Sequence, residues 1–82
     1  MNVEIVTPEK VLFESQGEMV VCRTANGEVA FLEGHEPFLG LLAPGTIRVI
    51  NGEEEFAFES TTGFVEVNGH EVRIISDDAK PV

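Results

Sequence analysis

Short runs of alternating apolar and polar residues, separated by glycine-containing turns, fill this chain. In residues 54–60, for example, Phe56 and Phe58 share one face, and Glu55, Ala57 and Glu59 share the other. Such a period of two is typical of a β-strand with one buried face. The pattern predicts strands at residues 2–7, 11–14, 18–24, 28–32, 38–42, 46–50, 54–60, 64–67 and 70–76. No stretch of twelve or more residues shows a helical apolar period.

The turns between these runs have recognisable sequences. Asn26-Gly27, Asn51-Gly52 and Asn68-Gly69 predict type I′ hairpins, in which both residues have positive φ. Pro44-Gly45 predicts a further turn, with Gly45 at positive φ. Many short strands at this spacing predict an all-β fold, a flattened antiparallel β-sandwich of about ten short strands.

The hairpin at Asn68-Gly69 shows how a turn assigns residues to faces. A two-residue loop would place Val67 opposite His70 and Val65 opposite Val72. The core face would then carry Val65, Val67, Val72 and Ile74. The other face would carry Glu66, Glu71 and Arg73, with Phe64 and Ile75 further from the turn.

The segment Phe38–Leu42, FLGLL, is apolar on both faces of its predicted strand. A sandwich this small cannot bury all the large apolar residues around this segment on one inner face. Those residues are Phe31, Leu32, Phe38, Leu39, Leu41 and Leu42. A strand with two apolar faces is typical of one whose second face is also covered. We therefore expect the cover to be either an edge of this chain or another protein.

Composition narrows the class of protein. The 82 residues correspond to a single domain, 1–82, and a hydrophobic fraction of 43% is sufficient for a core. A net charge of −10 repels phosphate groups, so we expect no nucleic-acid partner. No apolar run approaches the roughly 20 residues needed to cross a bilayer, so we expect no direct membrane insertion. A single cysteine is typical of a reducing compartment.

His35, flanked by Glu33 and Glu36, is the first candidate for a reactive or metal-binding site. A metal site needs three or four convergent ligands, more than one loop with a single histidine provides. His70, the other histidine, adjoins a different turn. We therefore expect no metal site, and interpret His35 as a residue that forms loop hydrogen bonds or partner contacts.

Signals for catalysis or cofactor binding are weaker still. Cys22 lies in an alternating run with Val20, where a buried cysteine behaves as a small hydrophobe, and no neighbour predicts a lowered pKa. The glycines form neither GxxxxGK nor GxGxxG, and Glu53–Glu55 lacks the spaced ligands of a Ca²⁺ loop. We expect no catalytic residue and no cofactor.

Three motifs in residues 27–50 occur in a fixed order: Gly27-Glu28, Gly34-His35-Glu36-Pro37 and Pro44-Gly45-Thr46-Ile47-Arg48. In order and spacing they resemble the epsilon subunit of F-type ATP synthases, in which proline usually occupies the position of Glu33. The opening VEIVTPEKVLFES and the closing TTGFVEVNGHEVRIISDDA are also similar to that family. The resemblance therefore covers essentially the whole chain.

The resemblance implies a non-catalytic β-sandwich of the central rotor stalk that binds the gamma subunit and the c-ring. Such a subunit couples proton-driven rotation to ATP synthesis as a peripheral part of the F1 sector, on the cytoplasmic face of an energy-transducing membrane. Carried over by position, Ala25 and Glu28 would face the c-ring. The gamma side would carry Thr7, His35, Gly40, Leu41 and Leu42.

Family members commonly continue into a C-terminal helical hairpin, which in some of them binds ATP and restrains hydrolysis. This chain stops at SDDAKPV, where the hairpin would begin, either as a naturally short form or as the N-terminal domain of a longer chain. We therefore expect no hairpin and no ATP binding. Two alternatives remain: a free-standing acidic β-sandwich that binds a small ligand or metal, and an enzyme with Glu36 or His35 as general base.

Overall fold

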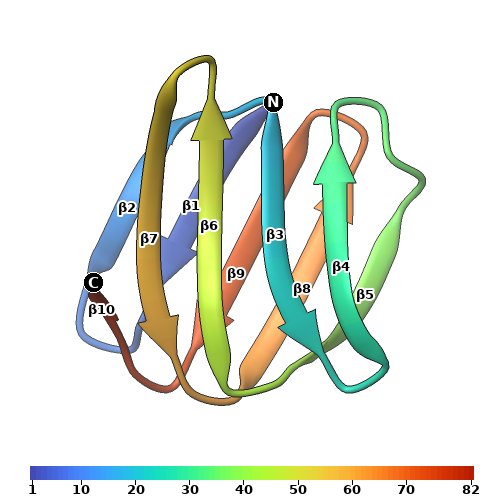
Figure 1. Ribbon diagram of the computed structural model, residues 1–82. Coiled ribbons are helices and arrows are strands. Elements are labelled where there is room, and N and C mark those ends of the chain that lie inside the picture. The colour runs from blue at the N-terminus through green and yellow to red at the C-terminus, as the bar shows by residue number, and fades with distance from the viewer.

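The computed structural model describes residues 1–82 as ten β-strands in two stacked layers (Figure 1). The strands are β1 (Asn2–Val6), β2 (Val11–Gln16), β3 (Met19–Thr24), β4 (Gly27–Leu32), β5 (Phe38–Leu42), β6 (Gly45–Asn51), β7 (Glu54–Ser60), β8 (Gly63–Asn68), β9 (Glu71–Ser76) and β10 (Ala79–Pro81). Nine of them match the predicted runs to within two residues at each end, and β10 is additional. The structure contains no helix, and hence none with the length and apolar character needed to cross a membrane.

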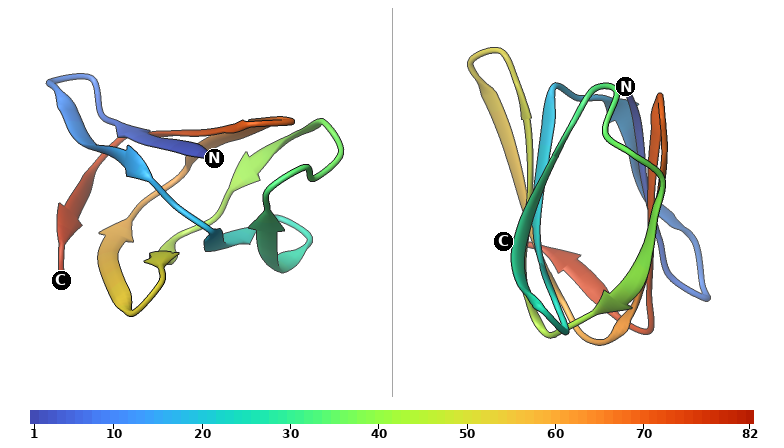
Figure 2. Two further views of the ribbon diagram at one scale, coloured as in Figure 1. Left: turned by 90° about the horizontal axis from the view of Figure 1, so that it is seen from above. Right: turned by 90° about the vertical axis from the view of Figure 1, so that its right-hand side faces the viewer.

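The two layers are each a sheet of five strands (Figure 2). The front sheet of Figure 1 has the order β10-β7-β6-β3-β4, and the back sheet has the order β5-β8-β9-β1-β2. A single residue pair, Thr24 opposite Leu42, joins β3 to β5 and so connects the sheets. The predicted β-sandwich is confirmed.

One strand pair is parallel, whereas the sequence predicted an antiparallel sandwich throughout. β1 pairs in parallel with β9, with Val3 opposite Val72 and Ile5 opposite Ile74. These two strands come from opposite ends of the chain. Because no hairpin connects them, local turn sequence does not determine their relative direction.

The core lies between the sheets and is almost entirely apolar. The inward-facing side chains of both sheets form this core. Among them are Val65, Val67, Val72 and Ile74, as the sequence predicted, and each is at most 3% exposed. Phe13 of β2 contacts Phe56 and Phe58 of β7, with ring centroids 5.1 and 5.2 Å apart. These aromatic contacts close the side of the sandwich on which β2 lies opposite β7.

The Asn-Gly turns are not the predicted type I′ hairpins, because no residue other than glycine has positive φ. In two of them the loop lies one residue later, at Gly52-Glu53 and Gly69-His70, with Gly52 at φ 65° and Gly69 at φ 46°. Positive φ at the first central position alone is the requirement of a type II′ turn. In the third, the loop is Ala25-Asn26, and Gly27 follows it at φ 115°.

The predicted turn at Pro44-Gly45 is instead a bend that carries the chain from β5 in the back sheet to β6 in the front sheet. Gly45 has φ 159°, which is close to extended backbone. A type II turn would need φ near 80° at this glycine. The bend therefore changes layers and makes no hairpin.

The shifted loop also changes the predicted register of the last hairpin. Val67 lies opposite Val72 rather than His70, and Val65 lies opposite Ile74 rather than Val72. The shift is two residues, an even number, so every side chain keeps its predicted face.

Candidate functional site

The most prominent surface feature is a line of apolar side chains across the outer face of the back sheet. Its members lie directly opposite one another, one on each of β5, β8, β9, β1 and β2. They are Leu41, Phe64, Ile75, Val6 and Val11, and we call them the apolar row. Leu41, Phe64, Ile75 and Val11 are 42–56% exposed, and Val6 is half-buried. Contiguous exposed apolar side chains of this kind mark interaction surfaces.

Strand alternation explains why this row is exposed. In β5, Leu42 points inward and is 2% exposed, whereas Leu41 points outward and is 56% exposed. Gly40 also faces inward, because a Cβ there would lie 2.6 Å from an atom of the Phe38 ring. This chain therefore covers one apolar face of β5 and leaves the other open. Leu39, also on the outer face, is 72% exposed.

A row of charged side chains runs beside the apolar row. It crosses β8, β9, β1 and β2 in register and consists of Glu66, Arg73, Glu4 and Glu14. The Arg73 Nε atom lies 3.0 Å from Glu4 Oε1. Glu66 and Glu14 form no salt bridge, so the outer face of the back sheet has an excess of negative charge next to its apolar row.

Two open hollows border this surface. The first hollow has a volume of about 440 Å³ and is lined by Pro37, Phe38, Leu39, Glu66, Val67 and Asn68. The second hollow has a volume of about 290 Å³ and is lined by Leu41, Thr62, Gly63, Phe64, Ile75 and Asp77. A Cβ at Gly63 would lie 1.9 Å from the Ile75 carbonyl oxygen, so only glycine fits at this position of the second hollow.

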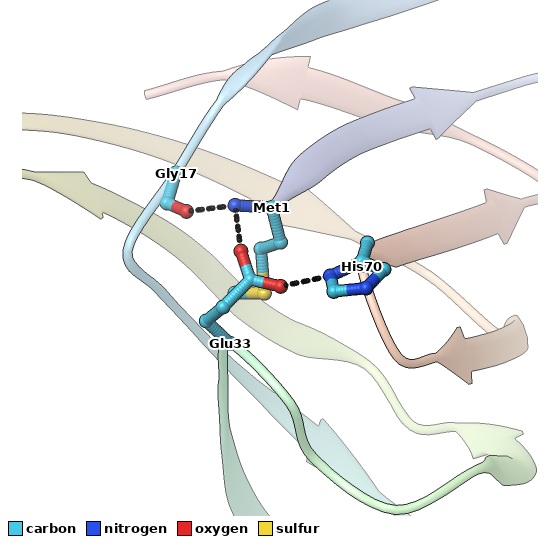
Figure 3. A network of polar contacts seen from close by, with 4 residues as sticks. All are labelled: Met1, Gly17, Glu33 and His70. Carbon is cyan, nitrogen blue, oxygen red and sulfur yellow. Dashed lines mark hydrogen bonds and ion pairs between the residues drawn. The ribbon is translucent and has the colours of Figure 1, made fainter.

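Glu33, a member of the sequence-predicted His35 cluster, forms an ion pair with the N-terminus (Figure 3). One carboxylate oxygen lies 2.6 Å from the Met1 ammonium, and the other lies 2.7 Å from His70 Nδ1. The Met1 ammonium also donates to the Gly17 carbonyl oxygen at 3.1 Å. Hydrogen bonds from the N-terminus and then from His70 lower the pKa of Glu33. The approach of His70 to this loop was not predicted from the sequence.

His35 contacts Phe31 of β4 and Glu36 of its own loop. Its ring lies edge-on to the Phe31 ring, with centroids 5.0 Å apart, and its Nδ1 lies 2.7 Å from the Glu36 carbonyl oxygen. No group of three or more His, Cys, Asp or Glu side chains is placed to hold a metal ion. Cys22 is fully buried, and burial raises its thiol pKa to about 11, with the charge of Glu28 adding to the shift. A thiol with this pKa remains protonated near neutral pH.

The other sequence-predicted contact residues fall into separate regions. Ala25 and Glu28 are exposed in the β3–β4 hairpin, at the bottom of Figure 1. The loop containing His35 lies at the opposite end. Thr7 follows Val6 of the apolar row but is 7% exposed, and its Oγ1 donates to the Lys10 carbonyl oxygen at 3.4 Å.

Sequence reasoning identified only part of the apolar row. It named Leu41 as a contact and assigned Phe64 and Ile75 to an outer face, but it missed Val6 and Val11. Their place in the row follows from the parallel pairing of β1 with β9. Local alternation indicates which face a residue occupies but not which strands are neighbours.

The fold and this surface define a ten-stranded β-sandwich with an exposed apolar row on one sheet. The chain belongs to the ATP synthase delta/epsilon chain, beta-sandwich domain family, which matches residues 1–82. It is 42% identical over 81 residues to the ATP synthase epsilon chain of Frankia casuarinae, a match that covers 98% of this chain and 95% of that one. The epsilon chain of Brevibacillus brevis is 36% identical over 81 residues, covering 98% of this chain and 61% of that one.

The structure is also similar to chains in solved ATP synthase assemblies. One occurs in the Euglena gracilis mitochondrial ATP synthase OSCP/F1/c-ring structure, with a TM-score of 0.89, 27% identity, and coverage of 96% of this chain and 51% of that one. Another occurs in the Tetrahymena thermophila mitochondrial ATP synthase central stalk/c-ring structure, with a TM-score of 0.82 and 21% identity over 98% of this chain and 65% of that one. The second likeness shows the fold alone. The chain thus spans nearly all of the Frankia relative and about three fifths or less of several others.

Proposed function

We propose that this protein is a non-catalytic subunit of the central rotor stalk of an F-type ATP synthase. In this role it binds the gamma subunit and the c-ring, and couples proton-driven rotation to ATP synthesis. It is a peripheral part of the F1 sector on the cytoplasmic face of the membrane. The observation that carries the proposal is the apolar row, which no part of this chain covers. Family membership supports the choice of complex.

The gamma subunit is the proposed cover of the apolar row. Burying large apolar side chains at the centre of an interface supplies most of its affinity, and the surrounding polar groups add specificity. In this arrangement Leu41 contacts gamma directly and Thr7 borders the other end of the row. Gly40 and Leu42 lie on the inner face of β5, so in this proposal they pack this strand against the core and do not contact gamma directly.

The c-ring is the proposed neighbour of the β3–β4 hairpin. Ala25 and Glu28 are exposed there, and the Ala25 amide donates to the Leu41 carbonyl oxygen at 3.0 Å. The two proposed contact regions are therefore linked by a backbone hydrogen bond. The Thr24–Leu42 pair connects the sheets at the same end, which favours transmission of torque through the domain as one body.

Glu28 offers a test of the c-ring contact. Because Glu28 is exposed, Glu28→Lys should leave the fold intact and weaken coupling, by repelling basic groups on polar loops of the ring. The measurement is ATP-driven proton pumping in reconstituted vesicles. Glu54→Lys makes the same charge change at an exposed position in the hairpin at the other end of the molecule, and should have no effect. Equal pumping by both variants would refute the ring contact.

Binding of purified gamma subunit tests the proposal as a whole. Isothermal titration of gamma with this protein should give saturable binding with a stoichiometry of one to one. The heat-capacity change on binding should be negative, because apolar surface is buried. Absence of binding would overturn the proposed function.

A further inference from the structure

The two hollows that border the outer face of the back sheet are lined by similar kinds of residue. Each combines apolar walls with a single carboxylate, which is Glu66 in the first hollow and Asp77 in the second. The projecting side chains of Leu39 and Leu41 border one hollow each. A site with apolar walls and one acidic group matches a side chain that has an aliphatic stem and a cationic head.

Neither carboxylate is neutralised within this chain. Glu66 lies opposite Arg73 in the strand register, but the Arg73 guanidinium pairs with Glu4 instead. The Asp77 Oδ2 atom accepts a hydrogen bond from Thr62 Oγ1 at 3.3 Å, and the Asp77 amide donates to the Thr62 carbonyl oxygen at 3.0 Å. These hydrogen bonds orient Asp77 and leave its charge without a cation.

The distance between the hollows follows from the strand that they share. Gly63 and Phe64 of β8 line the second hollow, and Glu66, Val67 and Asn68 of the same strand line the first. Residues three to four positions apart in a strand are separated by about 10–13 Å, at about 3.3 Å per residue. A single partner segment can therefore reach both hollows while it covers Leu41 and Phe64 of the apolar row.

We propose that the partner covering the apolar row inserts one Lys or Arg side chain into each hollow, where it pairs with Glu66 and with Asp77. This inference rests on the proposed function, under which the partner is the gamma subunit. The charge of the chain excludes the other occupants. A second copy of this protein would bring carboxylates against carboxylates, and a net charge of −10 repels an anionic lipid surface. A basic and apolar segment of another protein fits both features of the surface.

The two cationic anchors determine register and association rate more than affinity. Exposed charges that complement one another speed up encounter and exclude misaligned complexes, and their effect falls as salt increases. The apolar row supplies the salt-independent part of the binding free energy. The two contributions can therefore be separated by ionic strength.

The experiment measures gamma binding by surface plasmon resonance at 50 and 500 mM salt for wild type, Glu66→Gln, Asp77→Asn and the double variant. Both residues are exposed, so the variants should keep the fold, which circular dichroism melting curves check. At low salt we expect each single variant to associate with gamma about tenfold more slowly, and the association rate of the double variant to depend little on salt. The matched control, Glu54→Gln on the front sheet, should bind like wild type.

The possible outcomes separate the inference from the proposed function. If gamma binds wild type and both single variants equally at low salt, while Leu41→Asp no longer binds, the proposed function stands and the two-anchor inference is wrong. An effect of only one variant also overturns it. If wild type does not bind gamma at all, the proposed function itself fails. Restored binding of Glu66→Lys by a Lys→Glu or Arg→Glu change in gamma would support the inference and identify the anchor.

Discussion

The inner and outer faces of the back sheet are both rich in apolar side chains, but only one is sealed. Inner residues such as Val3, Ile5 and Val65 are fully buried by the front sheet. On the outer face, Leu41, Phe64 and Ile75 remain 42–56% exposed, because nothing in this chain lies over them. The two faces differ in whether this chain covers them, and not in the hydrophobicity of their side chains. The inner face accounts for folding, and the outer face accounts for the proposed assembly.

Leu42 gives the largest expected effect, because its side chain belongs to the sealed face. Leu42→Asp would place a carboxylate in an apolar core with no partner, which costs far more than a small domain can lose. We expect this variant to be unfolded by circular dichroism. The milder Leu42→Ala should lower the free energy of unfolding by about 2–5 kcal/mol. A fully stable Leu42→Asp variant would contradict the assignment of this residue to the core.

Leu41, the preceding residue, should behave in the opposite way. Leu41→Asp changes an exposed side chain, so the free energy of unfolding should stay within about 0.5 kcal/mol of wild type. Gamma binding should be lost, because the carboxylate would interrupt the apolar row. Leu32→Asp is a matched control, since Leu32 is also 56% exposed but lies on the front sheet. Titration with gamma should separate the two variants, and equal binding would argue against the back sheet as the docking face.

Glu33 gives the smallest expected effect, and it lies outside the docking surface. Its pKa is lowered in the folded state by the N-terminus and by His70. A lowered carboxyl pKa contributes stability above the unfolded-state pKa of about 4.3, and this contribution is lost as the pH falls through the folded-state value. Glu33→Gln should therefore be slightly less stable than wild type at pH 7. Urea unfolding should show this difference shrinking as the pH falls below the unfolded-state pKa, and an unchanging difference would refute the ionic origin.

Local sequence predicted the strands and their buried faces well, because a period of two determines which side chains share a face. It placed Phe56 and Phe58 together, and it identified Phe38–Leu42 as a strand with two apolar faces. It did not predict that β1 pairs with β9, which required contacts between opposite ends of the chain. For this reason Val6 was not assigned to the candidate site.

Turn chemistry was the other source of error. The Asn-Gly pairs correctly marked hairpins, but the loops are offset by one residue, because glycine alone takes positive φ. The clustering of Glu33 with His70 was also beyond sequence reasoning, since these residues are 37 positions apart.

The most direct test of the central claim is site-specific photocrosslinking in the assembled complex. Benzoylphenylalanine would be placed at position 41 of the apolar row and, in a separate protein, at position 32 of the front sheet, two positions with the same exposed fraction. The account predicts crosslinks to the gamma subunit from position 41 and none from position 32. Crosslinks to gamma from position 32 with none from position 41 would contradict it.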